Sequence, residues 1–249
     1  MGESASAVID IIIPVYNEAE GIISTLSSLA KSVRMPFRVL LCYDFEEDTT
    51  LVAIRAKGSQ GVDIELVRNR GRGAHAAVMS GFAYSRSPFV LVFPADDVYN
   101  ACILDTMFDM AANGVDIVCA SRFMPGGAMV GCPVLKAALV RMAALTLHKL
   151  ARLPSHDATN GFRVFSRRLL DTVSIESSEG FTYSLELLAK CHRLGWPISE
   201  IPAQWHERST GSSRFRVIRW IPAYLRWYFY VFQTTWLGRG PASVCRLKL

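Results

Sequence analysis

Short apolar runs that alternate with helical patterns decide what this 249-residue chain can fold into. The runs are nearly continuous and rich in Val and Ile, which is typical of strands covered on both faces of a parallel sheet. They occupy residues 8–16, 38–43, 62–67, 89–93 and 115–120. Helical patterns lie at residues 18–32, 49–57, 74–85 and 101–112. We therefore predict an α/β fold with a mostly parallel central sheet and right-handed crossovers.

Acidic residues follow the second run, at the strand end where a parallel sheet binds its ligands. Asp44 and Asp48 stand in the sequence YDFEEDTT, directly before the helical pattern at 49–57. Carboxylates at a strand end can accept hydrogen bonds from a nucleobase N–H or a ribose hydroxyl. Either one can instead cap the N-terminus of the following helix, and we expect one of the two to do only that.

The segment NRGRGA, residues 69–74, lies between the third run and a helix. Its glycines let backbone N–H groups approach an anion, and the helix N-terminus adds partial positive charge. Gly71, Gly73 and Ala76 also fit a loose G-x-G-x-x-A dinucleotide pattern, with Asp96 about 20 residues further on. A dinucleotide-dependent oxidoreductase is therefore one alternative, although the two arginines would crowd a pyrophosphate turn.

The acidic pair Asp96 and Asp97 ends a very apolar run, in the sequence PADD. A carboxylate there is well placed to hold Mg²⁺ or Mn²⁺ between two phosphates and to neutralise a departing diphosphate. The alternative is a polar strand end without a ligand, which two adjacent acids make the weaker interpretation.

Two later segments mix Gly, hydroxyl side chains and Arg, in the sequences DATNGFR (residues 157–163) and HERSTGSSR (residues 206–214). Arg recognises phosphate through a bidentate fork, and small residues let a loop approach its anion. The alternative is two ordinary turns, in which Gly161 and Gly211 serve backbone geometry alone.

Charge is distributed unevenly along the chain. The net charge is only +5, yet residues 201–249 carry eight basic residues and one acid, and residues 1–200 carry 19 basic and 21 acidic residues. Residues 133–153 and 216–237 have helical patterns that combine basic residues with an apolar side, which in the second stretch includes Trp220, Tyr224, Trp227 and Val231. We expect two helices that lie in a membrane interface. Helices that cover the core while their Arg side chains reach water are the alternative.

Composition excludes or disfavours several classes of protein. Six scattered cysteines without a C-x-x-C pair indicate reduced thiols, not a disulfide framework or a zinc site. The N-terminus has no basic segment before its apolar run, and no uncharged apolar stretch reaches the ~20 residues that span a bilayer. Bulky apolar residues between the basic ones argue against a nucleic-acid surface. We therefore expect a cytoplasmic protein, without a signal peptide or transmembrane span, attached peripherally to a membrane.

Taken in order, these motifs resemble the family 2 inverting glycosyltransferases, and within them the dolichol-phosphate mannose synthase branch. The resemblance covers roughly residues 11–216. IIIPVYNEAEGI is similar to the opening strand and P-x-Y-N-E turn, and RGRGAHAAVMSGF to the R-x-x-G-x-G-x-A element. SRFMPGG, DATNGFRVF and ERSTGSSRF are similar to three later motifs, the last two of which point to a polyprenyl-phosphate acceptor. The resemblance implies a GT-A-type nucleotide-sugar-binding fold.

The resemblance, with the motifs above, also implies roles for individual residues. Those expected to bind the nucleotide are Pro14, Tyr16, Asn17, Glu18, Asp44, Asp48, Arg70, Gly73 and Ala74. Those expected to act in catalysis are Asp96, Arg122 and Arg208. Those expected to bind the acceptor and its phosphate are Lys136, Arg141, Asp157, Asn160, Gly161, Arg163, Ser212 and Arg214. Asp96 and Asp97 are expected to hold the metal.

The metal site departs from the family pattern. It usually reads Asp-x-Asp, whereas this chain has Pro94, Ala95 and Asp96. Either Asp97 supplies the missing ligand, or water fills the gap, or the metal binds weakly. Tyr43 likewise replaces an acid after the second strand, and Arg214 replaces a Lys of the last motif.

The sequence thus predicts an enzyme with a catalytic domain at residues 1–214, which includes the helix at 133–153, and a basic aromatic membrane-interface segment at 215–249. It would transfer a hexose from a donor of the GDP-mannose or UDP-glucose type to a polyprenyl or dolichyl phosphate, with inversion. The acceptor phosphate is already an anion, so positioning and charge stabilisation would carry the reaction. The alternatives are a soluble family 2 transferase with a non-lipid acceptor and a non-catalytic membrane-associated partner. A homo-oligomer is compatible with all of these interpretations.

Overall fold

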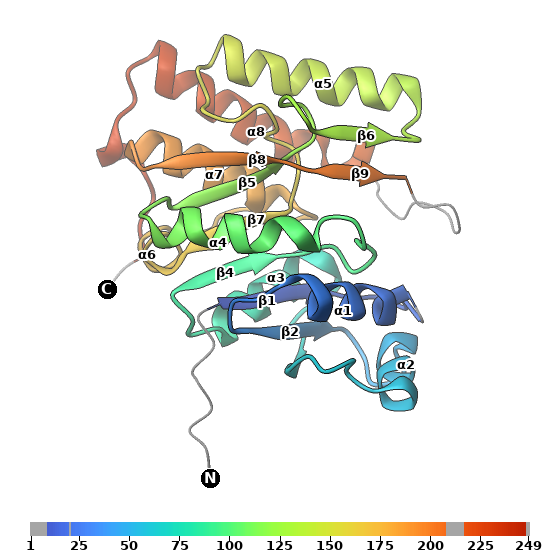
Figure 1. The fold of residues 1–249 in the computed structure, drawn as a ribbon. Coiled ribbons are helices and arrows are strands. Elements are labelled where there is room, and N and C mark those ends of the chain that lie inside the picture. Colours follow the sequence, from blue (N-terminus) through green and yellow to red (C-terminus); the bar gives the residue numbers. More distant parts are fainter. Residues whose placement is uncertain (1–8, 20, 208–216, 248–249) are drawn as a thin grey trace. The chain divides into compact units, whose positions relative to one another are not determined.

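The computed structural model describes residues 9–19, 21–207 and 217–247. Contacts divide the chain into two compact units (Figure 1). Unit 1 comprises Met1–Asn113 and Val164–Leu170, and unit 2 comprises Gly114–Arg163 and Asp171–Leu249. The C-terminal helix is therefore an integral part of unit 2, whereas the sequence sets residues 215–249 apart from the catalytic domain.

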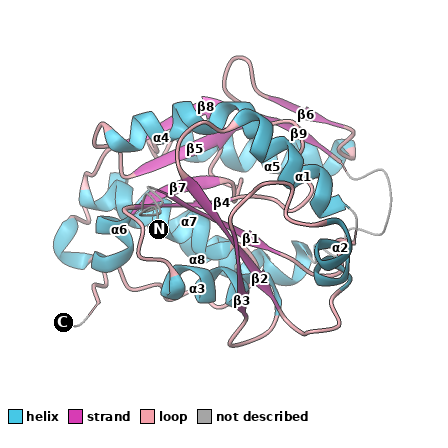
Figure 2. Ribbon diagram, turned by 60° about the horizontal axis from the view of Figure 1, so that its bottom comes forward, coloured by secondary structure: helices cyan, strands magenta, loops and turns pink. Residues whose placement is uncertain are grey.

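Unit 1 holds a sheet whose strands are ordered β3-β2-β1-β4-β7. They are β1 (Ile9–Pro14), β2 (Phe37–Tyr43), β3 (Ile64–Arg68), β4 (Phe89–Val92) and β7 (Arg163–Ser166), the last of which enters unit 1 at its second residue. β1 runs parallel to β2 and β4, and β2 runs parallel to β3 (Figure 2). The carboxyl ends of these four strands therefore meet at one edge, as the sequence predicts.

The helices of unit 1 connect these strands. They are α1 (Gly21–Ser32), α2 (Thr49–Lys57), α3 (Gly73–Tyr84), α4 (Leu104–Ala112), which a 3₁₀ turn at Ala101–Ile103 precedes, and α6 (Arg167–Thr172), which begins in unit 1. Ile12 and Leu40 are fully buried in the middle of the sheet. Gly81 brings α3 directly against β1, because a Cβ at this position would lie 2.7 Å from Ile12 Cδ1. The expected strands and helices of this unit are confirmed.

Unit 2 is built around a parallel strand pair and an almost wholly buried helix. β5 (Ile117–Ser121) pairs with β8 (Ile198–Pro202), which places Cys119 opposite Glu200. β6 (Ala128–Val130) and β9 (Gln204–His206) form a second parallel pair. The helices are α5 (Val134–Lys149), the buried α7 (Thr182–Leu194) and α8 (Val217–Trp236), which a 3₁₀ turn at Pro241–Ser243 follows. The sequence predicts β5, α5 and α8 but misses the other elements of this unit.

α8 packs against α7 around a buried ion cluster. Lys190 of α7 is fully buried and donates to Glu186 (2.7 Å) and Glu176 (2.7 Å). Its ammonium also lies 4.9 Å from the centre of the Trp227 ring of α8. Arg226 of α8 reaches the second oxygen of Glu176 (2.8 Å). Because a buried charge is costly without partners, the cluster fixes α7, the segment before it and α8 to one another.

The sequence assigns Trp227 and Val231 to the membrane side of α8, and the structure shows that this assignment is wrong. Both side chains are buried, with Trp227 only 1% exposed. The exposed apolar side chains in the described part of the helix are instead Ile221, Leu225, Phe229 and Trp236. The helix is apolar on more than one side, so its pattern alone does not identify the side that meets the protein.

α5 and α8 lie side by side in unit 2 (Figure 1). The hydroxyls of Thr146 and Tyr228 are 2.8 Å apart, and the Trp236 indole N–H donates to the Leu150 carbonyl (3.0 Å). The exposed apolar side chains in the described parts of the two helices, together the α5/α8 surface, are Val134, Leu135, Leu139, Met142, Leu145, Ile221, Leu225, Phe229 and Trp236. Neither helix contains an acidic residue. Within the described ranges, no helix is both long enough and apolar enough to cross a membrane.

Candidate active site

The turn after β1 is fastened to the start of α2. The Asn17 N–H donates to both carboxylate oxygens of Asp48 (3.1 and 3.0 Å), and the Asn17 side chain accepts from Thr49 N (3.2 Å). Asp48 also caps α2 by accepting from Thr50 N (2.8 Å), and it is fully buried. These contacts give Asp48 the helix-capping role that the sequence offers as the alternative to nucleotide binding.

Three further residues of the expected nucleotide site lie at the same strand end. Pro14 closes β1, and the backbone N–H of Glu18 donates to Thr50 Oγ1 (3.0 Å). Tyr16 is 46% exposed, and its ring meets Phe45 edge-on with 5.6 Å between the centres. The turn thus presents an exposed aromatic side chain on a backbone that α2 holds in place.

Asp44 fixes the glycine-rich segment that follows β3. Its carboxylate accepts from the Asn69 side chain (2.6 Å) and from Gly73 N (2.9 Å). Asn69 is buried, whereas Arg70 and Gly73 are exposed and Ala74 is half-buried. The hydrogen bonds of Asp44 therefore fix the start of α3 and leave it accessible, as an anion site requires. The sequence does not predict the role of Asn69, whose side-chain amide donates to Asp44.

The acidic pair after β4 divides into an exposed residue and a structural one. Asp97 accepts from Tyr99 N (2.9 Å), Asn100 N (3.0 Å) and the Asn100 side chain (2.6 Å). Burial raises the pKa of Asp97, and the hydrogen bonds from Asn100 only partly oppose that shift. Asp96 is exposed. These contacts give Asp97 a role in the turn, so the metal prediction rests on Asp96.

A metal at Asp96 would need oxygen ligands from the substrate. Among the residues that the structure describes, no group of three or more His, Cys, Asp and Glu side chains could hold a metal ion. Mg²⁺ is commonly bound by one or two carboxylates together with substrate phosphates and water. One exposed carboxylate at a strand end fits that pattern.

In unit 2, Arg122 follows β5 and is gripped by the buried carboxylate of Asp157. The Arg122 Nε and Nη2 atoms donate to the two carboxylate oxygens (2.6 and 2.9 Å), and Arg122 N adds a third bond (3.0 Å). Burial alone would raise the pKa of Asp157, but the charge and hydrogen bonds of Arg122 outweigh it and lower that pKa. The Arg122 side chain is 11% exposed, and its Nη1 makes no hydrogen bond within the described part of the chain.

Arg163 and Asn160, two other polar residues of the segment 157–163, are bonded inside unit 2. Arg163 is fully buried, and its guanidinium donates to the carbonyls of Asp157 (3.0 Å) and Ser184. Asn160 N donates to the Asp157 carboxylate (3.2 Å), and Asn160 Nδ2 donates to the Ala120 carbonyl (2.8 Å). These polar groups are thus used inside unit 2, and the expected role of Asp157, Asn160 and Arg163 toward the acceptor phosphate stays a prediction.

The remaining residues assigned to the acceptor are less closely connected. At Gly161 a Cβ would lie 3.4 Å from the Phe181 ring, so the glycine permits a close approach there. Lys136 donates to Glu207 (3.2 Å), and Arg141 is exposed on α5. The expected residues that lie outside the described part of the chain are Arg208, Ser212 and Arg214.

Residues 10–174 match the family described as glycosyl transferase family 2. The chain belongs to this family. It is 26% identical over 211 residues to the polyprenol monophosphomannose synthase of Mycolicibacterium smegmatis, a match that covers 82% of this chain and 79% of the relative. It is 28% identical over 209 residues to the undecaprenyl-phosphate mannosyltransferase of Micrococcus luteus, with 82% and 85% covered. The chain is thus a glycosyltransferase, and the oxidoreductase interpretation is set aside.

Solved structures confirm the GT-A-type fold. The chain is similar to glucosyl-3-phosphoglycerate synthase from Mycobacterium tuberculosis in complex with Mn²⁺, uridine diphosphate and glucosyl-3-phosphoglycerate, with a TM-score of 0.64, 17% identity, and 98% of this chain and 88% of that chain covered. The complex of that enzyme with uridine diphosphate gives a TM-score of 0.63 at 18% identity, with 93% and 80% covered.

We expect Asp157→Asn to reduce the free energy of unfolding by about 3 kcal/mol at pH 7, because it breaks a buried ion pair. The folded-state pKa of Asp157 lies below its unfolded value, so the contribution of the carboxylate is complete above about pH 4 and is lost as the pH falls through the folded pKa. The variant should therefore lose less stability than the wild type below pH 4. Urea unfolding across this pH range measures both effects.

Glu207→Gln is the matched control, since it breaks the half-exposed pair with Lys136 and should cost less than about 1 kcal/mol. Equal stability of Asp157→Asn and the wild type at pH 7 would contradict the role of the Asp157–Arg122 pair.

Proposed function

We propose that this glycosyltransferase transfers a hexose from a nucleotide sugar to the phosphate of a polyprenyl phosphate, with inversion at the anomeric carbon. The observation that carries the proposal is the Arg122–Asp157 pair of unit 2, which holds a guanidinium in a fixed orientation and leaves Nη1 available. Arg donates to phosphate oxygens through its fork of N–H groups. The names of the two curated relatives, both of which refer to a polyprenol-type acceptor, support the same acceptor class.

Unit 1 would bind the donor, of the GDP-mannose or UDP-glucose type. Tyr16, Asn17 and Glu18 would line the nucleotide pocket at the end of β1. Arg70 and the start of α3, which Asp44 fixes through Gly73, would face the diphosphate. Fixed hydrogen-bond donors are effective because they need no reorganisation when charge develops.

Asp96 would hold the divalent cation, Mg²⁺ or Mn²⁺. When bound, the cation would neutralise charge on the departing nucleoside diphosphate. The structurally similar glucosyl-3-phosphoglycerate synthase was solved in complex with Mn²⁺ and uridine diphosphate, which supports a divalent cation in proteins of this fold. This chain would contribute only one carboxylate, because the oxygens of Asp97 are bonded within their own turn.

On the acceptor side, the phosphate would act as the nucleophile without a general base, since it is already an anion. Arg122 would orient it, and Asp157 would keep the guanidinium from turning away. Lys136 and Arg141 on α5, together with Arg208, Ser212 and Arg214, would complete the attraction for phosphate. The enzyme would therefore act by positioning its two substrates and stabilising charge.

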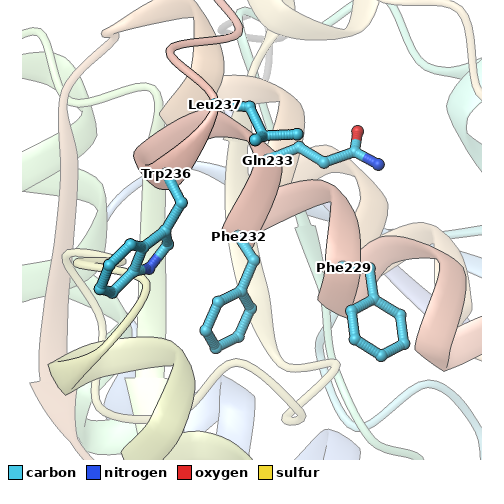
Figure 3. A pocket seen from close by; sticks show the side chains of 5 residues that line it. All are labelled: Phe229, Phe232, Gln233, Trp236 and Leu237. Atoms are coloured by element: carbon cyan, nitrogen blue, oxygen red, sulfur yellow. The ribbon is translucent and has the colours of Figure 1, made fainter.

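The α5/α8 surface would place the enzyme at the bilayer, where a polyprenyl phosphate is confined. On α8, Phe229, Phe232, Gln233, Trp236 and Leu237 line a shallow hollow of about 350 Å³. Figure 3 shows the three aromatic rings on one side of the helix. Arg141 and Lys149 are exposed on α5, and each basic residue near an anionic surface contributes about 1 kcal/mol.

The direct test of the reaction is a panel of radiolabelled sugar nucleotides incubated with the enzyme, Mg²⁺ or Mn²⁺ and undecaprenyl phosphate. We expect label in the organic phase for one hexose, and a loss of at least about a hundredfold in Asp96→Asn, because a metal stabilises charge by several kcal/mol. Label that stays in an aqueous sugar product would favour a soluble acceptor. Near-normal turnover of Asp96→Asn would contradict the metal assignment.

We expect Phe229→Ser to weaken binding to vesicles of phosphatidylglycerol and phosphatidylcholine by about tenfold, since burial of a Phe side chain contributes about 1.5 kcal/mol. The matched control is Val52→Ser on α2 of unit 1, because Val52 is 54% exposed and Phe229 is 56% exposed. Co-sedimentation measures the binding. Docking through the α5/α8 surface is wrong if the two variants bind equally well.

A further inference from the structure

Glu200 of β8 is a carboxylate that the proposed reaction leaves without a role. Its side chain is 12% exposed, and it lies opposite Cys119 of β5 in the parallel register. The strand β5 ends at Ser121, immediately before Arg122. Glu200 therefore stands beside the strand that delivers the phosphate-orienting arginine.

Within the described residues, the side-chain hydrogen bonds of Glu200 are made with Ser155 and His156, the two residues that precede Asp157. Glu200 Oε2 accepts from His156 N (2.7 Å) and from Ser155 Oγ (3.2 Å). The other oxygen, Oε1, is in hydrogen-bond contact with His156 Nδ1. Three contacts to two consecutive residues fix both the backbone and the side chains of this segment.

Ser155 connects this arrangement to Asp157. Its hydroxyl donates to Glu200 and at the same time accepts from Asp157 N (3.2 Å). Ser155 is fully buried, so water does not substitute for either bond. Asp157 then grips Arg122 with both of its oxygens. A continuous series of hydrogen bonds therefore runs from Glu200 through Ser155 and Asp157 to Arg122.

The imidazole of His156 is also held from its other side. The ring of His148, in the last turn of α5, stacks on it with 3.9 Å between the centres. His148 Nδ1 lies 3.0 Å from the Leu153 carbonyl, which fixes the His148 ring in turn. The segment before Asp157 is thus secured by β8 on one side and by the end of α5 on the other.

We infer that Glu200 is a positioning residue for the transfer reaction: it sets the orientation of the Arg122 guanidinium through Ser155, His156 and Asp157. The inference rests on the proposed role of Arg122 toward the acceptor phosphate. It assigns to Glu200 no contact with either substrate. Substitution of Glu200 should therefore change the KM for the acceptor and the order of the Arg122 guanidinium, but not the KM for the donor.

The test compares Glu200→Gln with the wild type and has two readouts. The first is hydrogen exchange of the Arg122 Nε–H by NMR, assigned by its absence from Arg122→Lys. The second is the pair of KM values for GDP-mannose and undecaprenyl phosphate. We expect exchange to accelerate and the KM for undecaprenyl phosphate to rise, each by about tenfold, as loss of one hydrogen bond to a charged group implies. The KM for GDP-mannose should change less than about twofold.

Glu186→Gln is the matched control, because Glu186 is a fully buried carboxylate of the same unit that contacts Lys190 and the backbone of residues 176 and 177. It should leave the Arg122 exchange rate and the KM for undecaprenyl phosphate unchanged. If Glu200→Gln does not fold, Ser155→Ala carries the same test, since it removes the hydroxyl that links Glu200 to Asp157.

Unchanged Arg122 exchange in the folded variant would overturn the inference, as would equal changes in Glu186→Gln. Failure of the proposed function gives a different result: Arg122→Lys would then leave the KM for undecaprenyl phosphate unchanged, while the exchange readout would still decide the role of Glu200.

Discussion

Buried and half-buried carboxylates need hydrogen-bond donors, and this requirement organises the strand ends of the protein. Asp48 holds the turn after β1, Asp44 holds the segment after β3, and Asp157 holds the arginine after β5. In each case the donors include backbone N–H groups of a loop, so satisfying the carboxylate also fixes the loop. A carboxylate left without these donors would cost more than the bonds themselves contribute.

The same requirement explains how the chain can transfer a sugar with few groups that act chemically. A phosphate nucleophile needs no base, and a diphosphate leaving group needs positive charge in a fixed place. Unit 1 contributes an ordered turn, an exposed helix start and an exposed Asp96, and unit 2 contributes an oriented Arg122. The turn, the helix start and Arg122 are held by Asp48, Asp44 and Asp157 respectively. Pre-organisation is therefore distributed over many ordinary hydrogen bonds.

Much of the fold follows from the sequence because buried parallel strands leave a strong apolar signal. The helix at 49–57 is confirmed, and Asp48 caps it as one of the two stated alternatives. The strand β8 is missed because its sequence, ISEIP, places Glu200 in the middle and Pro202 at the end, which breaks the apolar run. Its charged residue is explained only by the contacts with Ser155 and His156.

The sequence predicts which residue types follow the strands, but it does not predict the directions of their side chains. Arg163 belongs to a motif rich in phosphate-binding chemistry, yet its guanidinium binds carbonyl oxygens inside unit 2. Likewise Trp227 and Phe229 are neighbours on α8, and only packing against α7 makes one buried and the other exposed. Such differences depend on tertiary contacts that a periodic pattern does not contain.

We propose that Arg122 acts on the acceptor phosphate and not on the nucleotide sugar. Steady-state kinetics of Arg122→Lys test it most directly, because Lys can keep the ion pair with Asp157 but lacks the fork that leaves Nη1 available. We expect kcat/KM for undecaprenyl phosphate to fall by about 10- to 100-fold, as loss of a hydrogen bond between charged groups implies, and the KM for the nucleotide sugar to change less than about twofold. An equal rise in both KM values, or no change in either, would contradict it.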